Sequence, residues 1–160
     1  MSRSDVLIRR APADFADWES IRALILDAFA YMAGRIDPPS SASRLTTEAM
    51  AADAAAGALL FAEVGGALAG CVFVRAKGDA LYIGKLAIRP DLQRGGIGRA
   101  LVRAARAEAK SRGLAFLELQ TRVELAGNHE AFARMGFVKV GETAHPGYDR
   151  PTSVTMRAPV

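Results

Sequence analysis

The chain has 160 residues, of which 51% are hydrophobic and 24% are charged, with a formal net charge of +4 and an isoelectric point near 9.6. This length fits one domain that buries roughly 70% of its unfolded surface, and the composition excludes a largely disordered chain. Arginine is spread along the whole sequence, which argues against the clustered basic footprint of a nucleic-acid-binding protein.

The apolar stretches are too short to cross a membrane. The most apolar region, around "GALLFAEV", is interrupted by Asp53 and Glu63 well before about 20 residues. The N-terminus "MSRSDVLIRR" lacks the apolar core of a secretory signal, and the single Cys71 has no partner for an internal disulfide. We therefore expect a cytoplasmic protein.

Strand and helix patterns alternate along the chain. A strand pattern at 5–11 precedes a helical pattern that Pro12 opens and that runs toward Met32. A loop at 34–43 holds the Pro38-Pro39 pair, and a short helix follows, capped by Thr46 or Thr47 and closed by Gly57. The remaining patterns are strands at 58–64, 67–76 and 80–88, a helix ending near 112, a strand at 115–121, a helix at 128–135, and strands at 137–143 and 153–159.

The order of these elements predicts the fold class. Gly65-Gly66 and Gly78-Asp79 suit hairpin turns between consecutive strands, whereas the later strands are separated by helices. Hairpins combined with helical crossovers imply a mixed sheet covered by helices. We predict a single α/β (α+β) domain over residues 1–160, with a mixed central sheet of about seven strands and helices on both faces.

A glycine-rich turn stands where a basic helix begins, in "RPDLQRGGIGRALVRAARAEAK" (89–110). The first turn of a helix has N–H groups without internal partners and carries about half a positive charge. Gly95, Gly96 and Gly98 leave this backbone accessible, and Arg94 and Arg99 add cationic side chains. The turn therefore predicts an anion site, most plausibly for phosphate.

Three phosphate-binding patterns compete for this spacing. The Walker loop requires a Lys followed by Ser or Thr, which the turn lacks. The dinucleotide fingerprint needs Gly or Ala where Leu101 stands. The pattern Q/R-x-x-G-x-G/A is met at every fixed position by residues 93–98.

That last stretch resembles the pyrophosphate loop of the Gcn5-related N-acetyltransferases, the GNAT superfamily. Upstream, "KLAIRP" matches the family's strand end "l-A-V-x-P" with Leu86, Ala87, Ile88 and Pro90, and downstream "NHEAFARMGF" matches its Asn-initiated helix before "G-F". The likeness covers about 59–140, and the element order is that of the GNAT fold. A weaker likeness to some members lies in "AFAYMAGRIDPP" and "GYDR".

The resemblance implies acetyl-CoA as co-substrate, without a metal. The loop would take the pyrophosphate through Gln93, Arg94, Gly95, Gly96, Ile97, Gly98 and Arg99. The strand would pair with the pantetheine arm through Leu86, Ala87 and Ile88, and one of its amides would polarise the thioester carbonyl. Asn128 resembles the family's pantetheine-binding Asn; a plain helix N-cap is the alternative reading.

The sequence departs from the family at the residue that usually donates a proton. Phe132 stands where the family has Tyr, so it can pack against the coenzyme but cannot act as an acid. The strand "YIGKLAI" offers only Lys85 where a Glu is common. We expect the proton route to be relocated, with Tyr148 and His145 as the catalytic candidates; the alternative is catalysis by positioning and oxyanion donors alone. Glu118 is expected to point to solvent.

The acceptor pocket falls in variable segments. Tyr31, Arg35 and Asp37 lie where the first helix meets the Pro-Pro loop. Arg35 suits a carboxylate and Asp37 an ammonium group, as in an amino acid or a peptide end, although ordinary helix-end polarity explains these residues equally well.

We therefore expect an N-acetyltransferase that moves the acetyl group of acetyl-CoA directly to a primary amine of a small molecule, peptide or protein. Cys71, within an apolar strand, is expected to be a buried structural residue rather than a nucleophile. The alternatives are a non-catalytic CoA-binding or sensing domain and a nucleic-acid-binding module. The expected partner is the amine acceptor, with no nucleic acid and no membrane; a homodimer is left open, because dimers are frequent in the superfamily.

Overall fold

The computed structural model describes residues 5–160 and contains the predicted order of elements. The strands are β1 (Val6–Arg10), β2 (Ala58–Val64), β3 (Ala67–Lys77), β4 (Ala80–Ile88), β5 (Phe116–Arg122), β6 (Val138–Thr143) and β7 (Ser153–Pro159). The helices are α1 (Trp18–Phe29), α2 (Thr47–Ala56), α3 (Ile97–Ser111) and α4 (Ala126–Arg134), with short 3-10 turns at Ala30–Met32, Ser41–Arg44 and Pro90–Leu92.

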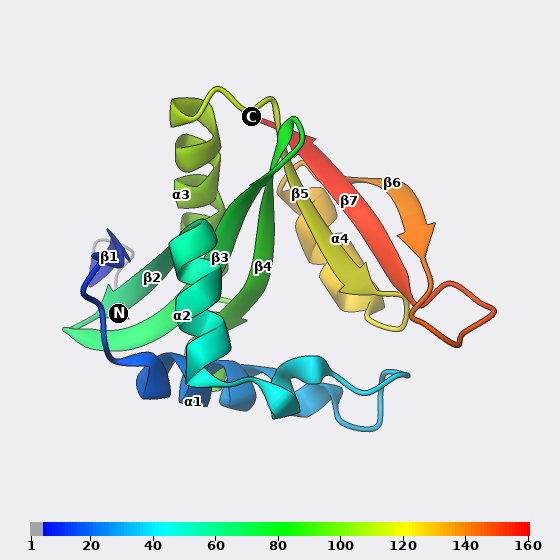
Figure 1. Cartoon of the computed structure of the whole chain (residues 1–160), viewed down its shortest axis with the longest axis horizontal. Helices are drawn as coiled ribbons and strands as arrows, with labels where there is room; N and C mark the ends of the chain where they lie inside the picture. The colour runs from blue at the N-terminus through cyan, green and yellow to red at the C-terminus, as the bar shows by residue number, and fades with distance from the viewer. Residues whose placement is uncertain (1–4) are drawn as a thin grey trace.

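The seven strands form one mixed sheet in the order β1-β2-β3-β4-β5-β7-β6. Neighbouring strands are antiparallel throughout, except that β4 and β5 run parallel. In Figure 1, β4 and β5 lie together at one end and separate toward the other, so the sheet is divided by a wedge. The predicted seven-stranded mixed sheet is thereby confirmed.

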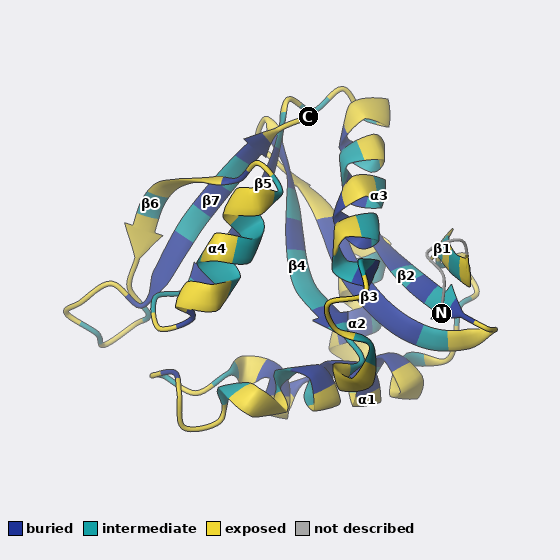
Figure 2. Ribbon diagram, turned by 180° about the vertical axis from the view of Figure 1, so that it is seen from behind, coloured by how far each residue is buried: buried dark blue, intermediate teal, exposed yellow. Residues whose placement is uncertain are grey.

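Helices cover both faces of the sheet, as predicted. On one face, α3 buries Leu101, Val102 and Ala105 against strand residues such as Val72 and Leu117. Figure 2 shows this face, with the buried stripe of α3 turned toward the strands and its exposed residues turned outward. The other core forms beneath α1 and α2 from the residues Ile21, Leu24, Ile25, Ala28, Met50, Leu59, Cys71 and Phe73.

Glycines and a threonine define the predicted element ends. Gly65, Gly66 and Gly78 have positive φ in the hairpin turns, as the sequence predicted. The Thr46 side chain accepts a hydrogen bond from Ala49 N at 3.1 Å and caps α2. At the end of α2, a Cβ added to Gly57 would lie 1.9 Å from the carbonyl oxygen of Val74, so only glycine fits there.

Two helix starts differ from the prediction. Helix α1 does not begin at Pro12 but at Trp18, because the Asp17 side chain accepts a hydrogen bond from Ser20 N and caps the helix there. The preceding segment is held as a turn, with Phe15 packed edge-on against Trp18 at 4.9 Å between ring centroids. Helix α4 begins at Ala126, two residues before Asn128, with Leu125 as its N-cap.

Among residues 5–160, no helix combines the length and apolar character that crossing a bilayer requires.

Candidate active site

The glycine-rich turn leads from β4 into the N-terminus of α3. Arg94 and Gly96 both take left-handed backbone conformations, with φ of 67° and 89°. Gly96 is the N-cap of α3, where within the described part of the chain no side chain makes a capping hydrogen bond and the first turn has no acidic residue. The first N–H groups of the helix therefore lack a carboxylate or hydroxyl partner, while Arg94 and Arg99 are exposed nearby. These features form a site suited to an anion.

The wedge between β4 and β5 begins close to the N-terminal ends of both strands. The two strands pair over only three residues of each, Ala80–Tyr82 with Phe116–Glu118, and then diverge. Further along β4, Gly84 pairs with Phe73 and Ala87 with Cys71, so Lys85 and Leu86 both stand opposite Val72 in a β-bulge. Lys85 has a φ of 52°, which marks the bulge as a distorted strand position.

Strand alternation divides the three β4 residues predicted to bind pantetheine between the two cores. Leu86 and Ile88 pack against the α3-side core, whereas Ala87 is buried in the core beneath α1 and α2. The backbone between them borders the wedge, which leads from the bulge to the glycine-rich turn (Figure 1). The strand edge and the anion site are therefore continuous.

Helix α4 follows the strand on the far side of the wedge. Phe132 is partly buried with its ring centroid 5.7 Å from that of Phe137. The Asn128 side chain donates a hydrogen bond to the Tyr31 hydroxyl at 3.3 Å, which ties α4 to the turn after α1. The alternative reading of Asn128 as the helix N-cap is wrong, because Leu125 occupies that position and Asn128 lies within the first turn.

Asp37 joins three segments at the predicted acceptor side. Its carboxylate accepts hydrogen bonds from the Tyr148 hydroxyl at 2.6 Å and from Arg150 at 2.9 Å, while its backbone N–H donates to Glu124 at 3.0 Å. Both carboxylate oxygens are thus engaged, so Asp37 is not free to hold an ammonium group in this conformation. Arg122 also donates to the Pro38 carbonyl oxygen at 2.7 Å.

The other two predicted acceptor residues lie just before Asp37. The Arg35 guanidinium lies 6.0 Å from the ring centroid of Tyr31, and both residues are exposed. The structure therefore brings together two pairs of the predicted site residues. Asn128 contacts Tyr31, and Tyr148 contacts Asp37.

Both predicted catalytic residues are held by neighbouring side chains. The hydrogen bond to Asp37 raises the pKa of Tyr148 above its usual value, so its proton stays in place and is directed at that carboxylate. Burial, followed by the positive charge of Arg122, lowers the pKa of His145, so that its imidazole is neutral at pH 7. His145 Nδ1 lies in a hydrogen bond with the Thr152 hydroxyl.

Sequence reasoning missed the residue pair at the closed end of the wedge. Tyr82 and Glu118 form the last pair between β4 and β5. Glu118 is only 5% exposed and bonds to Lys77 at 2.7 Å and to Arg157 at 2.9 Å, so the expectation that it points to solvent is wrong. Because Leu117 and Leu119 on either side are apolar, strand alternation predicted an exposed Glu118. The sequence did not show that Lys77 and Arg157 cover that face of β5 and bind the carboxylate.

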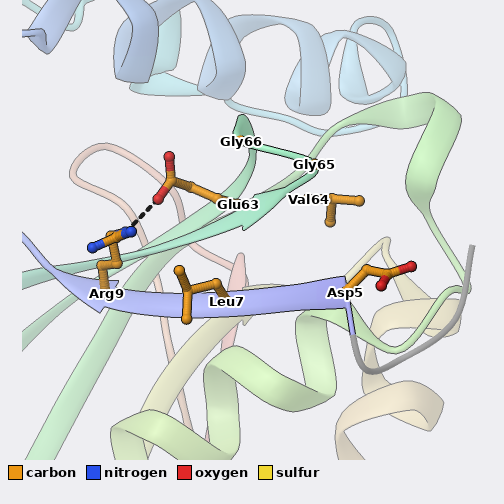
Figure 3. Close-up of a pocket in the computed structure, with 7 residues that line it drawn as sticks. All are labelled: Asp5, Leu7, Arg9, Glu63, Val64, Gly65 and Gly66. Atoms are coloured by element: carbon orange, nitrogen blue, oxygen red, sulfur yellow. Dashed lines mark hydrogen bonds and ion pairs between the residues drawn. The ribbon is translucent and has the colours of Figure 1, made fainter.

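Two hollows lie away from the wedge. One, of about 390 Å³, is at the β1 edge of the sheet, where Figure 3 shows Leu7 and Arg9 beside Glu63 and the Gly65-Gly66 turn, with Arg9 paired to Glu63. The other, of about 670 Å³, lies between α4 and the strands β6 and β7 and includes Phe137. Neither is lined by the glycine-rich turn or by β4.

Cys71 is fully buried, and burial raises its pKa to about 12. Its thiolate is therefore not formed at neutral pH, which agrees with the expected structural role. Among the described residues, no group of three or more His, Cys, Asp and Glu side chains is arranged to hold a metal ion.

The seven-stranded mixed sheet, the wedge between β4 and β5 and the uncapped N-terminus of α3 form one continuous arrangement. The family model described as "Acetyltransferase (GNAT) family" matches residues 18–137, which is most of the chain. The chain therefore belongs to the GNAT acetyltransferase family, whose members transfer the acetyl group of acetyl-CoA to amines.

Solved structures share this fold at low sequence identity. The PaiA N-acetyltransferase of Thermoplasma acidophilum, in complex with coenzyme A, is 15% identical with a TM-score of 0.81, over 97% of this chain and 99% of that one. An IAA acetyltransferase of Bacillus cereus ATCC 14579 is 21% identical with a TM-score of 0.69, over 97% and 99% of the two chains. The ribosomal-protein-S18-alanine N-acetyltransferase of Escherichia coli is 20% identical with a TM-score of 0.69, over 96% and 93%. No curated protein sequence matches the chain.

Proposed function

We propose that this acetyltransferase moves the acetyl group of acetyl-CoA directly to a primary amine within the wedge between β4 and β5. The observation that supports this most strongly is the continuity of three features. The strands diverge after Tyr82, β4 then bulges at Lys85, and the glycine-rich turn follows with an uncapped helix. One extended ligand with an anionic centre and a reactive end fits this arrangement.

The pyrophosphate of CoA binds at the turn formed by 93–99. The N–H groups at the start of α3 donate to its oxygens, and the helix dipole favours its charge. Arg94 and Arg99 are exposed at the same place and add charge-assisted contacts. The first turn of α3 contains no acidic side chain that would compete with the pyrophosphate for these N–H groups.

The pantetheine arm lies along β4 from Ile88 toward the bulge. From Ile88 back to Gly84 the strand spans on the order of 13 Å at its usual rise, which is comparable to the length of an extended pantetheine arm. The thioester then lies beside the backbone of the bulge, where an amide of β4 stabilises the oxyanion that forms on attack. Phe132 and Asn128 on α4 line the opposite side.

The amine acceptor enters beside the segment 31–37. Within residues 5–160, Arg35 lies over a tyrosine ring and has no carboxylate partner. The Asp37 carboxylate, in contrast, is paired with Arg150 and accepts a hydrogen bond from Tyr148. This difference favours an acceptor that carries a carboxylate for Arg35 as well as its reactive amine, such as an amino acid or a peptide end. Tyr148 and His145 remain candidates for contact with this acceptor.

The compartment we propose is the cytoplasm, in keeping with the free, buried thiol of Cys71.

Calorimetry with CoA, combined with thiol release from acetyl-CoA, tests the proposal. We expect Gly96→Val to weaken CoA binding at least about tenfold, because it forces a branched side chain into a left-handed backbone at the helix N-terminus. Gly113→Val is the matched control. Gly113 has a φ of 71° and lies just beyond the C-terminal end of α3. Valine at this position therefore imposes a similar backbone strain far from the turn and should leave CoA affinity unchanged.

Thiol release with a panel of amines separates an enzyme from a CoA sensor. Acceptor-dependent release supports the proposed transfer, with the greatest release expected for amines that also carry a carboxylate. Tight CoA binding without release across the panel would favour the sensing domain. Wild-type affinity in Gly96→Val would contradict the pyrophosphate site itself.

A further inference from the structure

Tyr82 lies at the closed end of the wedge, on the face of the sheet away from α3. Its neighbours Leu81 and Ile83 are buried in the α3-side core, so alternation along β4 directs Tyr82 to the other face. A Cβ added to Gly84 would lie 3.4 Å from a ring carbon of Tyr82. The ring therefore leans along β4 over Gly84, toward the bulge at Lys85.

The Tyr82 hydroxyl also reaches across to β5. The backbone of Gln120, two residues beyond the last β4–β5 pair, lies close enough to the phenol to favour a lower pKa of Tyr82. The hydroxyl thus stands between the two strands where they have begun to diverge.

Charged residues of β3 and β5 lie around the ring. From β3, the Arg75 guanidinium lies 4.8 Å and the Lys77 ammonium 5.2 Å from the ring centroid. From β5, Glu118 stands opposite Tyr82, and it is bonded to Lys77 and to Arg157 of β7. Burial raises the pKa of Tyr82, so the phenol remains protonated at neutral pH.

We propose that Tyr82 is the proton donor to the departing sulfur of CoA; this inference rests on the transfer proposed above. The amine nitrogen attacks the thioester carbonyl carbon, and the C–N bond forms. When the C–S bond breaks, the electron pair goes to sulfur, which takes the Tyr82 hydroxyl proton. The phenolate recovers a proton that the attacking nitrogen releases, so the amide and the CoA thiol are formed without net proton uptake.

The other candidate donors are less well placed for this step. Phe132 has no proton to give, and the Tyr148 proton is directed to Asp37. His145 is neutral and held by Thr152. Tyr82 is the tyrosine whose ring lies over the strand that carries the bulge. Tyr82 on β4 therefore takes the role of the acid that other family members carry on α4 at the position of Phe132.

The steady-state kinetics of acetyl transfer by Tyr82→Phe test the assignment. This variant keeps the ring and its contacts with Arg75 and Lys77, and removes only the hydroxyl. We expect kcat to fall about 100-fold, the usual contribution of general acid catalysis, with CoA affinity and KM for acetyl-CoA unchanged. Arg103→Gln is the control: it removes an exposed cation from α3, outside the proposed site, and keeps kcat near the wild-type value.

The leaving group provides a readout that a purely structural role would not change. A selenol is a stronger acid than a thiol and departs without a proton, so acetyl transfer from the selenium analogue of acetyl-CoA should be nearly equal in wild type and Tyr82→Phe. A wild-type kcat in Tyr82→Phe, or an equal loss with both donors, would overturn the role of Tyr82 while leaving the proposed transfer intact. If the wild type releases no CoA with any amine, the proposed function fails, and this inference fails with it.

Discussion

Individual side chains at the acceptor side hold one another in place. Asp37 receives Tyr148 and Arg150 from the connection between β6 and β7, and Glu124 accepts its backbone N–H. These bonds join segments more than 80 positions apart in the chain. The Tyr148 hydroxyl therefore holds the Asp37 segment in position through its hydrogen bond to the Asp37 carboxylate.

Tyr148→Phe tests that role. The loss of one charge-assisted hydrogen bond should loosen the Asp37 segment and raise KM for the amine about tenfold. Steady-state kinetics over several pH values, with CoA affinity measured in parallel, check this. A large fall in kcat with an altered pH profile would instead make Tyr148 the proton donor and contradict our assignment of Tyr82; an unchanged KM and kcat would remove Tyr148 from the site.

At the scale of elements, close backbone contacts determine where glycine is required. The end of α2 meets β3 at Gly57, where no space remains for a Cβ beside the Val74 carbonyl. Gly127, in the first turn of α4, has no atom within 4 Å of the corresponding position and has an ordinary φ. The same substitution should therefore have opposite effects at the two positions.

We expect Gly57→Ala to destabilise the fold by at least about 3 kcal/mol, because the backbone of α2 or β3 must move. Gly127→Ala should stabilise it by up to about 1 kcal/mol through helix propensity. Urea denaturation of both variants measures the two changes. Equal stability of Gly57→Ala and wild type would show that α2 and β3 are not packed as closely as described.

The whole sheet is two antiparallel parts joined at a narrow junction. Strands β1–β4 and β5–β7 meet only where three residues of β4 pair with three of β5. Across this junction, Glu118 of β5 bonds to Lys77 of β3 and to Arg157 of β7, and Arg157 pairs with Asp79 at 3.1 Å. This buried carboxylate therefore helps to join the parts on either side of the wedge.

Replacing Glu118 by Gln should lower the free energy of unfolding by about 2 kcal/mol at pH 7, because its hydrogen bonds to charged groups are weakened. Burial alone would raise the pKa of Glu118, but Lys77 and Arg157 lower it below its ordinary value. Its contribution is therefore full above the unfolded-state pKa and is lost as the pH falls through the folded-state pKa. The difference should begin to shrink below about pH 4.3, the ordinary pKa of Glu, and disappear only below the lowered folded-state pKa.

Denaturation curves at several pH values measure this dependence. Glu130→Gln is the control, because Glu130 is exposed and its pair with Arg134 at 3.8 Å should contribute little. A difference between wild type and Glu118→Gln that persists in acid would mean that the Glu118 carboxylate is not the stabilising group.

The sequence by itself determined the order of the elements, the mixed sheet and the position of the glycine-rich turn before α3. Hydrophobic alternation, hairpin glycines and the spacing of 93–98 are local patterns, and local backbone physics is enough to interpret them. Thr46 and Gly57 were located for the same reason, since capping depends on the nearest residues. The helix starts were less certain, because Asp17 and Leu125 compete with neighbouring residues for the N-cap position.

Only the tertiary structure decided which side chains meet. Tyr82 and Glu118 are 36 positions apart and become neighbours through the parallel β4–β5 pair, whose register is set by packing on both faces of the sheet. Asp37 meets Tyr148 because the two connections fold onto the same side of the molecule. Such contacts depend on how distant segments are packed together, and a one-residue change of register would reverse the face that each strand residue occupies.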